Sequence, residues 1–378
     1  MLSSNTYIIS SALIRVGRYF NKSYKDLIRE LVAELNKDLP IHDYIDYVVV
    51  SNVFSDSILE QLDISTMIIQ ELNLTPKPAV RVEAGESSGL MALKYAHSLI
   101  KSGMTSTVLV IGVEKLVEYP TTVVNKYMVR LLNSDVEGRY DIVTVNEAAL
   151  LMKLYMKKHG HSREDLTIWP IKMHENAVNN PYAQLRNRIT KEQVINSQII
   201  SDPLRLFDVH PLGDGASAIV LTNNKELMSK VGTGCVELID VLHASAPPLT
   251  HRSDLLSLPA SKYLFSKLGN YGVDLSDCVL EIHDSYTILA YLIVEELGLS
   301  DRGKAPYVVT DIKNINLSGG LKARGHPVGA TGVYQVAEVH RLLTSGLGSI
   351  KLNNSWGLVH SMSSIDNNAA VALIRRCG

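Results

Sequence analysis

The sequence predicts an α/β protein built from two related halves, and three observations support this. Residues 87–112 (SSGLMALKYAHSLIKSGMTSTVLVIG) and 330–355 (ATGVYQVAEVHRLLTSGLGSIKLNNS) share two glycines and a histidine at identical spacing. Each copy runs from small residues into helical apolar spacing and then a strand, which is typical of parallel sheets with right-handed crossovers. Finally, the 378 residues exceed the ~250–300 that one core usually supports.

The elements of the two copies follow in the same order. Apolar residues recur at helical spacing from Leu90 to Ile100. Gly103 then stands where a helix end needs a left-handed residue, as Gly346 does in the second copy. We expect TSTVLVIG to be the strand after the first helix and GSIKLNN the strand after the second.

The chain between the copies has a different character. EAALLMKLYMKKHG predicts an amphipathic helix, whereas NAVNNPYAQLRNRITKEQV predicts a long ordered loop. We expect an insertion at about 115–205 that lies over the first half. The first half then covers residues 1–235 and the second 236–378, with the proline-rich segment 245–253 as a loop after the first strand of the second half.

Composition and charge narrow the class of ligand. The chain is 46% apolar and 20% charged, as an ordinary globular protein is. With 37 Lys plus Arg against 39 Asp plus Glu, nothing indicates a nucleic-acid or anionic-membrane surface, and we expect neither partner. No apolar run approaches the ~18–20 residues of a membrane span, and no signal-peptide pattern is present, so a cytoplasmic location is expected.

The cysteines give no indication of a special site. Cys235, Cys278 and Cys377 are widely separated, which suits neither a disulfide framework nor paired metal ligands. We expect all three to be reduced and structural, and we expect no metal site.

Several segments together carry a family resemblance. The stretch NINLSGGLKARGHPVGATGVYQVAEVHRLL closely resembles the C-terminal signature of thiolases, Asn-x-Ser-Gly-Gly followed by Gly-His-Pro-x-Gly-Ala-Thr-Gly. EIHDSYTILAYLIVEELGL is similar to the His-Asp segment of sterol-carrier-protein-type thiolases and their archaeal acetyl-CoA acetyltransferase-like relatives. The stretch from NNPYAQLRNRITKEQV to DVHPLGDGASAIVL is similar to their insertion and the strand after it. The resemblance covers nearly the whole chain.

The resemblance implies a fold and a chemistry. It implies βαβαβαββ halves stacked in five layers (αβαβα) with an inserted loop domain, assembled as a homodimer or homotetramer. It also implies an acyl-CoA thioester as substrate or ligand in lipid metabolism, with no permanently bound cofactor. Relatives that lack the family's cysteine include aldolases that require a small OB-fold partner protein.

Two histidines match the family's catalytic bases. His326, in GHPVGATG, corresponds to the histidine that activates the nucleophile, and an imidazole with a pKa near ~6.5 both takes and returns a proton at neutral pH. The alternative is a core histidine in a glycine-rich turn. His283, in IHDSYT, corresponds to the histidine that binds and polarises the thioester oxygen; the alternative is a structural hydrogen bond to Asp284.

The nucleophile itself is changed. Family members read roughly Val-Glu-Ala-x-Cys-x-Ser-Gly, whereas this chain reads VEAGESSG, so Glu86 falls on the cysteine. A glutamate, with a reference pKa near ~4.3, is a far poorer acyl acceptor than a thiolate, so ordinary thiolysis is not expected. Ser87 and Ser88 carry hydroxyls, but the turn of the chain should point them away.

The remaining candidates lie in the second half. Asn316, Ser318, Gly319 and Gly320 would bring backbone close to a bound thioester, with a plain tight turn as the alternative. His360 is a candidate acid in GLVHSMSSIDNNAAVAL, where serines replace the family's glycines.

Other residues near these segments receive no catalytic role. His210 is given none, and Asp214 and Gly215 are interpreted as turn residues. Tyr286 is interpreted as a buried aromatic of a helix.

Three functions are compatible with this pattern. In the first, Glu86 acts as a base or orients water, and the protein makes or breaks carbon–carbon bonds in acyl-CoA substrates, or decarboxylates them, without an acyl-enzyme. In the second, the chain is a non-catalytic subunit or scaffold paired with an active thiolase or an OB-fold protein. In the third, Ser87 replaces the cysteine of an acyltransferase.

Overall fold

The computed structural model describes residues 5–231 and 234–377. Within them the main sheet has nine strands in the order β3-β2-β4-β7-β1-β8-β11-β10-β9. The strands are β1 (Thr6–Leu13), β2 (Tyr47–Ser51), β3 (Ala79–Val82), β4 (Thr107–Glu114), β7 (Gly215–Thr222), β8 (Val236–Ser245), β9 (Cys278–Glu281), β10 (Trp356–Ser363) and β11 (Asn368–Arg376). Strands β3, β2 and β4 are parallel to one another, as are β9 and β10, and the remaining pairs are antiparallel. The predicted parallel pairing therefore holds within each half, in a sheet that is mixed as a whole.

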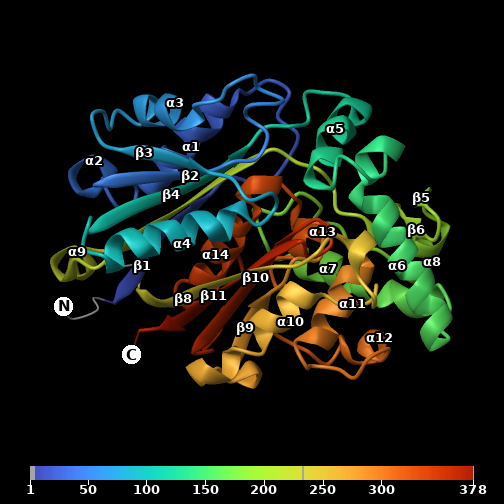
Figure 1. Ribbon diagram of the computed structural model, residues 1–378. Helices are drawn as coiled ribbons and strands as arrows, with labels where there is room; N and C mark the ends of the chain where they lie inside the picture. Colours follow the sequence, from blue (N-terminus) through green and yellow to red (C-terminus); the bar gives the residue numbers. More distant parts are fainter. Residues whose placement is uncertain (1–4, 232–233, 378) are drawn as a thin grey trace.

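Helices and sheet alternate in five layers, as predicted (Figure 1). One outer layer packs on the first half of the sheet and contains α1 (Tyr24–Leu35), α2 (Ile41–Tyr44) and α3 (Ile64–Glu71). The central layer contains α4 (Ser88–Lys101) and α14 (Thr331–Leu343). The other outer layer contains α10 (Pro259–Phe265), α11 (Thr287–Glu296) and α12 (Ala305–Val308). The short helix α9 (Lys225–Lys230) lies between β7 and β8 in the chain.

The repeat is confirmed by the central pair of helices. Both begin right after a turn that carries a site residue, and both are followed by a left-handed glycine, Gly103 at φ +76° and Gly346 at φ +95°. Where α4 and α14 cross, a Cβ on Gly89 would lie 2.6 Å from the Cα of Gly332. Only glycine permits so close an approach of two backbones.

One predicted strand is wrong. TSTVLVIG forms β4 as expected, but GSIKLNN does not form a strand, and β10 begins later, at Trp356. Leu347 and Ile350 bond to each other in a tight local turn that follows α14. The chain therefore needs several more residues before it reaches the sheet.

The insertion lies between β4 and β7, and it packs differently from our expectation. It contains α5 (Thr121–Met128), α6 (Thr144–His159), α7 (Ile168–Ala177), α8 (Lys191–Asn196), β5 (Ile199–Ser201) and β6 (Leu204–Arg205). Helices α6 and α7 contact α11 of the second half, and α7 also contacts α13 (Gly320–Arg324). Their buried aromatic residues Tyr155 and Trp169 join Tyr291 of α11 in one apolar cluster. The prediction that the insertion covers the first half therefore holds for α5, which packs on Val53, Phe54 and Ile58, and is wrong for α6 and α7.

Three other expectations about this part of the chain are confirmed. The amphipathic helix is α6, residues 178–190 form a loop, and the proline-rich segment follows β8 as a loop with a short 3₁₀ turn. The predicted boundary at residue 235 falls immediately before β8. The division into domains at that point stays a prediction.

The cysteine expectation needs a correction. Cys235 and Cys377 form a disulfide, and Cys278 is free and buried. Strands β8 and β11 are antiparallel neighbours in which Val236 lies opposite Arg376, so the residues just beyond them meet. Their separation of 142 residues concealed a contact that only the sheet register creates.

In the described part of the chain, every helix is too short or too polar to cross a bilayer.

Candidate active site

Glu86 lies in the turn between β3 and α4. Gly85 has φ +59°, and a Cβ there would overlap the Ser363 hydroxyl at 2.0 Å, so the turn requires glycine. The Ser361 hydroxyl donates to the Glu86 carbonyl oxygen at 3.0 Å and fixes the turn against β10. Only 3% of Glu86 is exposed. The turn therefore aims the carboxylate into the interior.

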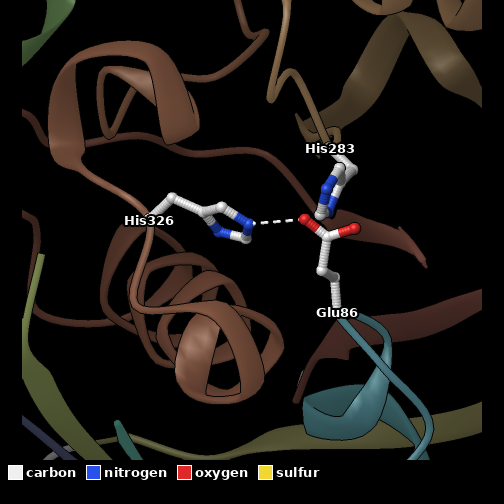
Figure 2. A group of neighbouring side chains, drawn as sticks. All are labelled: Glu86, His283 and His326. Carbon is white, nitrogen blue, oxygen red and sulfur yellow. Dashed lines mark hydrogen bonds and ion pairs between the residues drawn. The ribbon is translucent and has the colours of Figure 1, made fainter. Parts of the chain in front are cut away.

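His326 faces the Glu86 carboxylate from the loop between α13 and α14, as Figure 2 shows. Its Nε2 lies 2.9 Å from Glu86 Oε1, and its Nδ1 lies 2.7 Å from the Thr331 hydroxyl. The His326 backbone N–H donates to the Pro211 carbonyl. Thr331 begins α14, so the helix that crosses α4 also holds the imidazole.

The second oxygen of Glu86 has its own donor. The Ser364 backbone N–H reaches Glu86 Oε2 at 2.8 Å, and Ser364 has the positive φ of +54° that aims this N–H inward. The Ser364 hydroxyl donates to the Leu131 carbonyl at 2.7 Å. The serine-rich segment at the end of β10 thus brings a backbone donor to the Glu86 carboxylate.

His283 completes the group from just beyond the end of β9. One ligand atom each of Glu86, His283 and His326 can be chosen so that all lie within 4.8 Å of one another. The rings of His283 and His326 meet edge to face at 5.4 Å between centroids (Figure 2). Both ring nitrogens of His283 are buried, and no described residue forms a hydrogen bond with either. An unpaired buried polar group costs ~1–3 kcal/mol, so the ring is prepared for a ligand.

His283 does not form the structural hydrogen bond to Asp284 that was the alternative to a catalytic role. Asp284 points elsewhere: its carboxylate accepts from Trp169 Nε1 at 2.9 Å and from the Leu321 N–H at 2.7 Å. Burial raises the pKa of Asp284 to about 7. Asp284 therefore anchors α7 and α13 and leaves His283 free.

Burial sets the charge of the imidazoles. It lowers the pKa of His326 to about 3, with the nearby Arg324 guanidinium acting in the same direction. It also lowers the pKa of His283 well below its usual value, although the Glu86 carboxylate opposes this shift. Both rings are neutral at pH 7, so the expected pKa of His326 near 6.5 is corrected. The contact of His326 with Glu86 is a hydrogen bond from a neutral ring.

The predicted thioester-binding residues lie behind His283. The Asn316 amide exchanges two hydrogen bonds with the Ile282 backbone, at 2.7 and 3.1 Å. Ser318 donates from its N–H and hydroxyl to the buried Glu281 carboxylate. Side chains at Gly319 and Gly320 would overlap Ala177 and Asp284, at 2.5 and 2.3 Å respectively.

These four positions fix the end of β9 and thereby His283. Their binding of a thioester stays a prediction.

His360 is not brought together with the other three candidates. It lies inside β10, one residue before Ser361, which contacts Glu86. Because successive strand residues face opposite sides, the buried His360 points to α10 on the face of β10 opposite to Ser361, where its Nε2 lies 2.8 Å from the Ser261 hydroxyl. Ser261 also donates to Asp366. The role of His360 as an acid stays a prediction.

Sequence reasoning missed His210. Its ring meets that of His326 edge to face at 4.5 Å between centroids, and its Nδ1 lies 2.8 Å from the Ser285 carbonyl. Burial lowers its pKa to about 3. His210 sits 116 positions before His326 in the numbering, and nothing in the sequence pattern indicates this contact.

Neighbouring residues gave mixed outcomes. Tyr286 is a buried aromatic, as interpreted, but it lies just before α11 in extended backbone and not in the helix, and its hydroxyl lies 2.9 Å from Thr144 Oγ1. Asp214 and Gly215 are not turn residues: Gly215 begins β7, and the Asp214 carboxylate accepts from the backbone of Leu116 and Val117.

The serines beside Glu86 are engaged elsewhere. Ser87 Oγ donates to the Ala84 carbonyl and lies 2.8 Å from Asn368 Oδ1. Ser88 Oγ donates to the Gly85 carbonyl. Both hydroxyls thus serve the turn, as the expected chain direction implied.

Two surface cavities flank the site. One, of about 460 Å³, is lined by residues of the Glu86 turn and α5 region, including Glu83, Arg81, Arg130 and Leu131. The other, of about 280 Å³, includes Leu212, whose backbone pairs with that of His326. Neither of these two cavities is lined by Glu86, His283 or His326. A ligand would have to part the chain between a cavity and the three side chains.

Comparison with known families gives two matches. The thiolase N-terminal domain matches residues 6–225, and the thiolase C-terminal domain-like family matches residues 266–376. The acetyl-CoA acetyltransferase of Methanothermobacter thermautotrophicus is 30% identical, covering 98% of this chain and 99% of that relative. Sterol carrier protein 2 of Bos taurus is 27% identical over 84% of this chain and 62% of its own length.

Solved structures agree on the fold. The structure described as Ltp2-ChsH2(DUF35) aldolase has a TM-score of 0.79 at 18% identity and covers 98% of both chains. Human mitochondrial 3-ketoacyl-CoA thiolase has a TM-score of 0.76 at 16% identity over the full length of both chains. At such identities the likeness concerns the fold alone.

Proposed function

Because this chain belongs to the thiolase family, we propose that it binds acyl-CoA thioesters and uses Glu86 as a base. The reaction we propose makes or breaks a carbon–carbon bond beside the thioester without an acyl-enzyme. The supporting observation is the 2.9 Å contact of Glu86 with His326, beside an unpaired His283. A solved structure of the same fold is described as an aldolase.

The cleavage direction can be written with balanced atoms. Glu86 accepts the proton of a β-hydroxyl group, and the bond between the α and β carbons breaks. The β carbon leaves as an aldehyde or ketone, while the electron pair passes to the thioester as an enolate. Glu86 then returns the proton to the α carbon, which gives the shortened acyl-CoA. Condensation is the same sequence in reverse.

The two histidines have different tasks in this proposal. A ring N–H of His283 donates to the thioester oxygen, where negative charge develops, and removal of one such donor costs ~10²–10³ in rate. His326 and the Ser364 N–H each hold one oxygen of Glu86. They orient the carboxylate and leave its charge available for the proton.

An assay with three thioesters tests the proposal. The purified protein is incubated with acetyl-CoA, acetoacetyl-CoA and a β-hydroxyacyl-CoA, alone and with any co-purifying small protein. We expect an aldehyde or ketone from the β-hydroxyacyl-CoA, no acylated protein by intact mass, and loss of activity in Glu86→Gln. The exposed Glu192→Gln is the matched control. Acylated wild-type protein would contradict the proposal.

A second function has its own supporting observation. The three side chains are closed off, with His283 and His326 fully buried and Glu86 3% exposed, which suits a non-catalytic subunit of an active thiolase or an OB-fold protein. This alternative predicts measurable acyl-CoA binding by calorimetry without turnover. Product formation by the isolated chain would exclude it.

We also propose assembly as a homodimer or homotetramer, and association with a small OB-fold partner. The family membership supports the first, and the name of one similar structure, which includes a DUF35 component, supports the second. Light scattering of the purified chain tests the oligomeric state, and co-purification tests the partner.

A further inference from the structure

We propose that Glu86, His283 and His326 form a binding site for one divalent transition-metal ion of the zinc class. This inference does not rest on the proposed acyl-CoA chemistry: an ion between Glu86 Oε1 and His326 Nε2 would replace the hydrogen bond that joins them, so metal binding and base catalysis are alternative uses of the same side chains. It departs from the expectation of no metal site. That expectation rested on the spacing of the cysteines and did not consider histidines far apart in the sequence. The substitution of glutamate for cysteine supplies the third ligand.

The distances suit a single ion. Zinc takes imidazole nitrogens at ~2.0–2.1 Å and carboxylate oxygens at ~2.0–2.2 Å, which places two tetrahedral ligands about 3.3 Å apart. Glu86 Oε1 and His326 Nε2 are 2.9 Å apart, and all three ligand atoms lie within 4.8 Å of one another. Side-chain movements of about an ångström or less would bring them to an ion.

His283 is the observation that points to a ligand. Both of its ring nitrogens are buried without a partner, and the ring is turned toward the Glu86 carboxylate (Figure 2). Folding has removed this imidazole from water and given it no hydrogen bond in return. A metal ion between His283 and Glu86 would satisfy one nitrogen and explain why the fold tolerates the ring.

The other two ligands are already oriented by their neighbours. The Ser364 N–H holds Glu86 Oε2 at 2.8 Å, which leaves Oε1 to face the ion. Thr331 Oγ1 lies 2.7 Å from His326 Nδ1. If the His326 proton moves from Nε2 to Nδ1, the threonine oxygen accepts it and the Nε2 lone pair is free for the metal. Such outer partners commonly fix metal-binding histidines.

The donor set selects the kind of ion. Two imidazoles and one carboxylate suit zinc, cobalt, iron or nickel, whereas calcium and magnesium require oxygen ligands. Three protein ligands leave one tetrahedral position open. Two neutral rings and one carboxylate also leave a net positive charge on a bound divalent ion, so the open position favours an anionic oxygen.

Metal loading of untagged protein tests the site. The protein is stripped with a chelator, incubated with Co²⁺ or Zn²⁺, desalted and measured by elemental analysis. We expect about one ion per chain, a visible Co²⁺ absorption band and a raised Tm. Glu86→Gln and His283→Gln should each weaken binding by at least about 10-fold. The exposed residues provide the matched controls His251→Gln and Glu192→Gln, which should bind like wild type.

Either of two results would overturn the proposal. One is a loaded wild-type protein that retains no ion above the background of a chelator-treated sample. The other is equal loading of wild type, E86Q and H283Q. If a variant does not fold by circular dichroism, X-ray absorption of cobalt-loaded wild type decides, because a spectrum without imidazole scattering excludes this site. No thioester enters these measurements, so their outcome is independent of the acyl-CoA assay.

Discussion

At the scale of single residues, the Glu86 turn brings a carboxylate to two histidines in the interior. The Glu86 carboxylate meets His326 Nε2 at 2.9 Å and the Ser364 N–H at 2.8 Å. The sequence pattern named Glu86, His283 and His326, and the fold brings the three side chains together. It could not show that His283 lacks partners, because an unpaired nitrogen is a property of the packed interior.

The turn makes a specific prediction for Glu86→Cys. A thiol at this position should lie within reach of His326, whose neutral ring can accept its proton. We therefore expect slow acylation of the variant by acetyl-CoA, detected as an added acetyl group by intact-protein mass spectrometry. Glu86→Ala and the double variant Glu86→Cys/His326→Asn should remain unmodified. A folded E86C protein that stays unmodified would show that the cavity no longer admits a thioester.

At the scale of elements, the close crossing of α4 and α14 joins the two halves. Glu86 lies in the turn just before α4, and His326 lies five residues before α14 and is held by Thr331, the first residue of that helix. The repeat in the sequence predicted both helices and their glycines. The closeness of Gly89 to Gly332 could not be predicted, because the sequence does not specify which faces of two helices meet.

Adding a methyl group where α4 and α14 cross should destabilise the protein. In Gly89→Ala or Gly332→Ala, the new methyl group would lie 2.6 or 2.8 Å from backbone atoms of the other helix. Overpacking of this kind costs ~1–3 kcal/mol, and urea denaturation should show it. Gly269→Ala is the control, because a Cβ there meets nothing within 4 Å. Equal stability of all three variants would mean that the helices separate freely.

The disulfide at the ends of β8 and β11 predicts how many cysteine thiols react in the unfolded protein. Protein unfolded without reductant should react through Cys278 alone, and protein unfolded with reductant should react through all three cysteines. Cys377→Ser should lower the free energy of unfolding by ~2–4 kcal/mol. Thiol titration and urea denaturation measure the two effects. Three reactive thiols without reductant would disprove the disulfide.

At the scale of the whole molecule, buried histidines and buried carboxyl groups have opposite effects on stability as the pH falls. Burial lowers the pKa of several histidines, to about 4 for His97, His174 and His340, to about 3 for His210, His326 and His360, and well below the usual value for His283. Burial also raises the pKa of carboxyl groups, to about 7 for Glu114, Glu147 and Asp284, about 8 for Glu281 and about 6 for Asp366.

The two sets act with opposite sign. As the pH falls below ~6.5, the unfolded chain binds protons on histidines that the folded protein keeps neutral, so stability is lost. As the pH falls from ~8 to ~4.5, the folded protein binds protons on the buried carboxyl groups before the unfolded chain does, so stability is gained. Below ~4.5 the carboxyl gain is complete and only the histidine loss continues.

Stability should therefore change little between about pH 5 and 6.5 and fall steeply below about pH 4.5. Urea denaturation at a series of pH values measures this. His97→Leu removes one buried imidazole of α4. In this variant the free energy of unfolding should fall less steeply in acid, by about 1.4 kcal/mol per pH unit. An unchanged slope in this variant would show that His97 is not neutral in the folded protein.

The sequence by itself displayed the duplicated halves and the motifs of the family, and the resemblance to that family implied the five layers. These features depend on local spacing and on fixed small residues, which a single chain displays directly. The tertiary structure alone decided four others: the disulfide, the packing of α6 and α7 on the second half, the contact of His360 with α10, and the contact of His210 with His326. Each depends on which distant segments become neighbours. That choice is set by the free energy of packing the whole chain, which no local stretch of sequence displays.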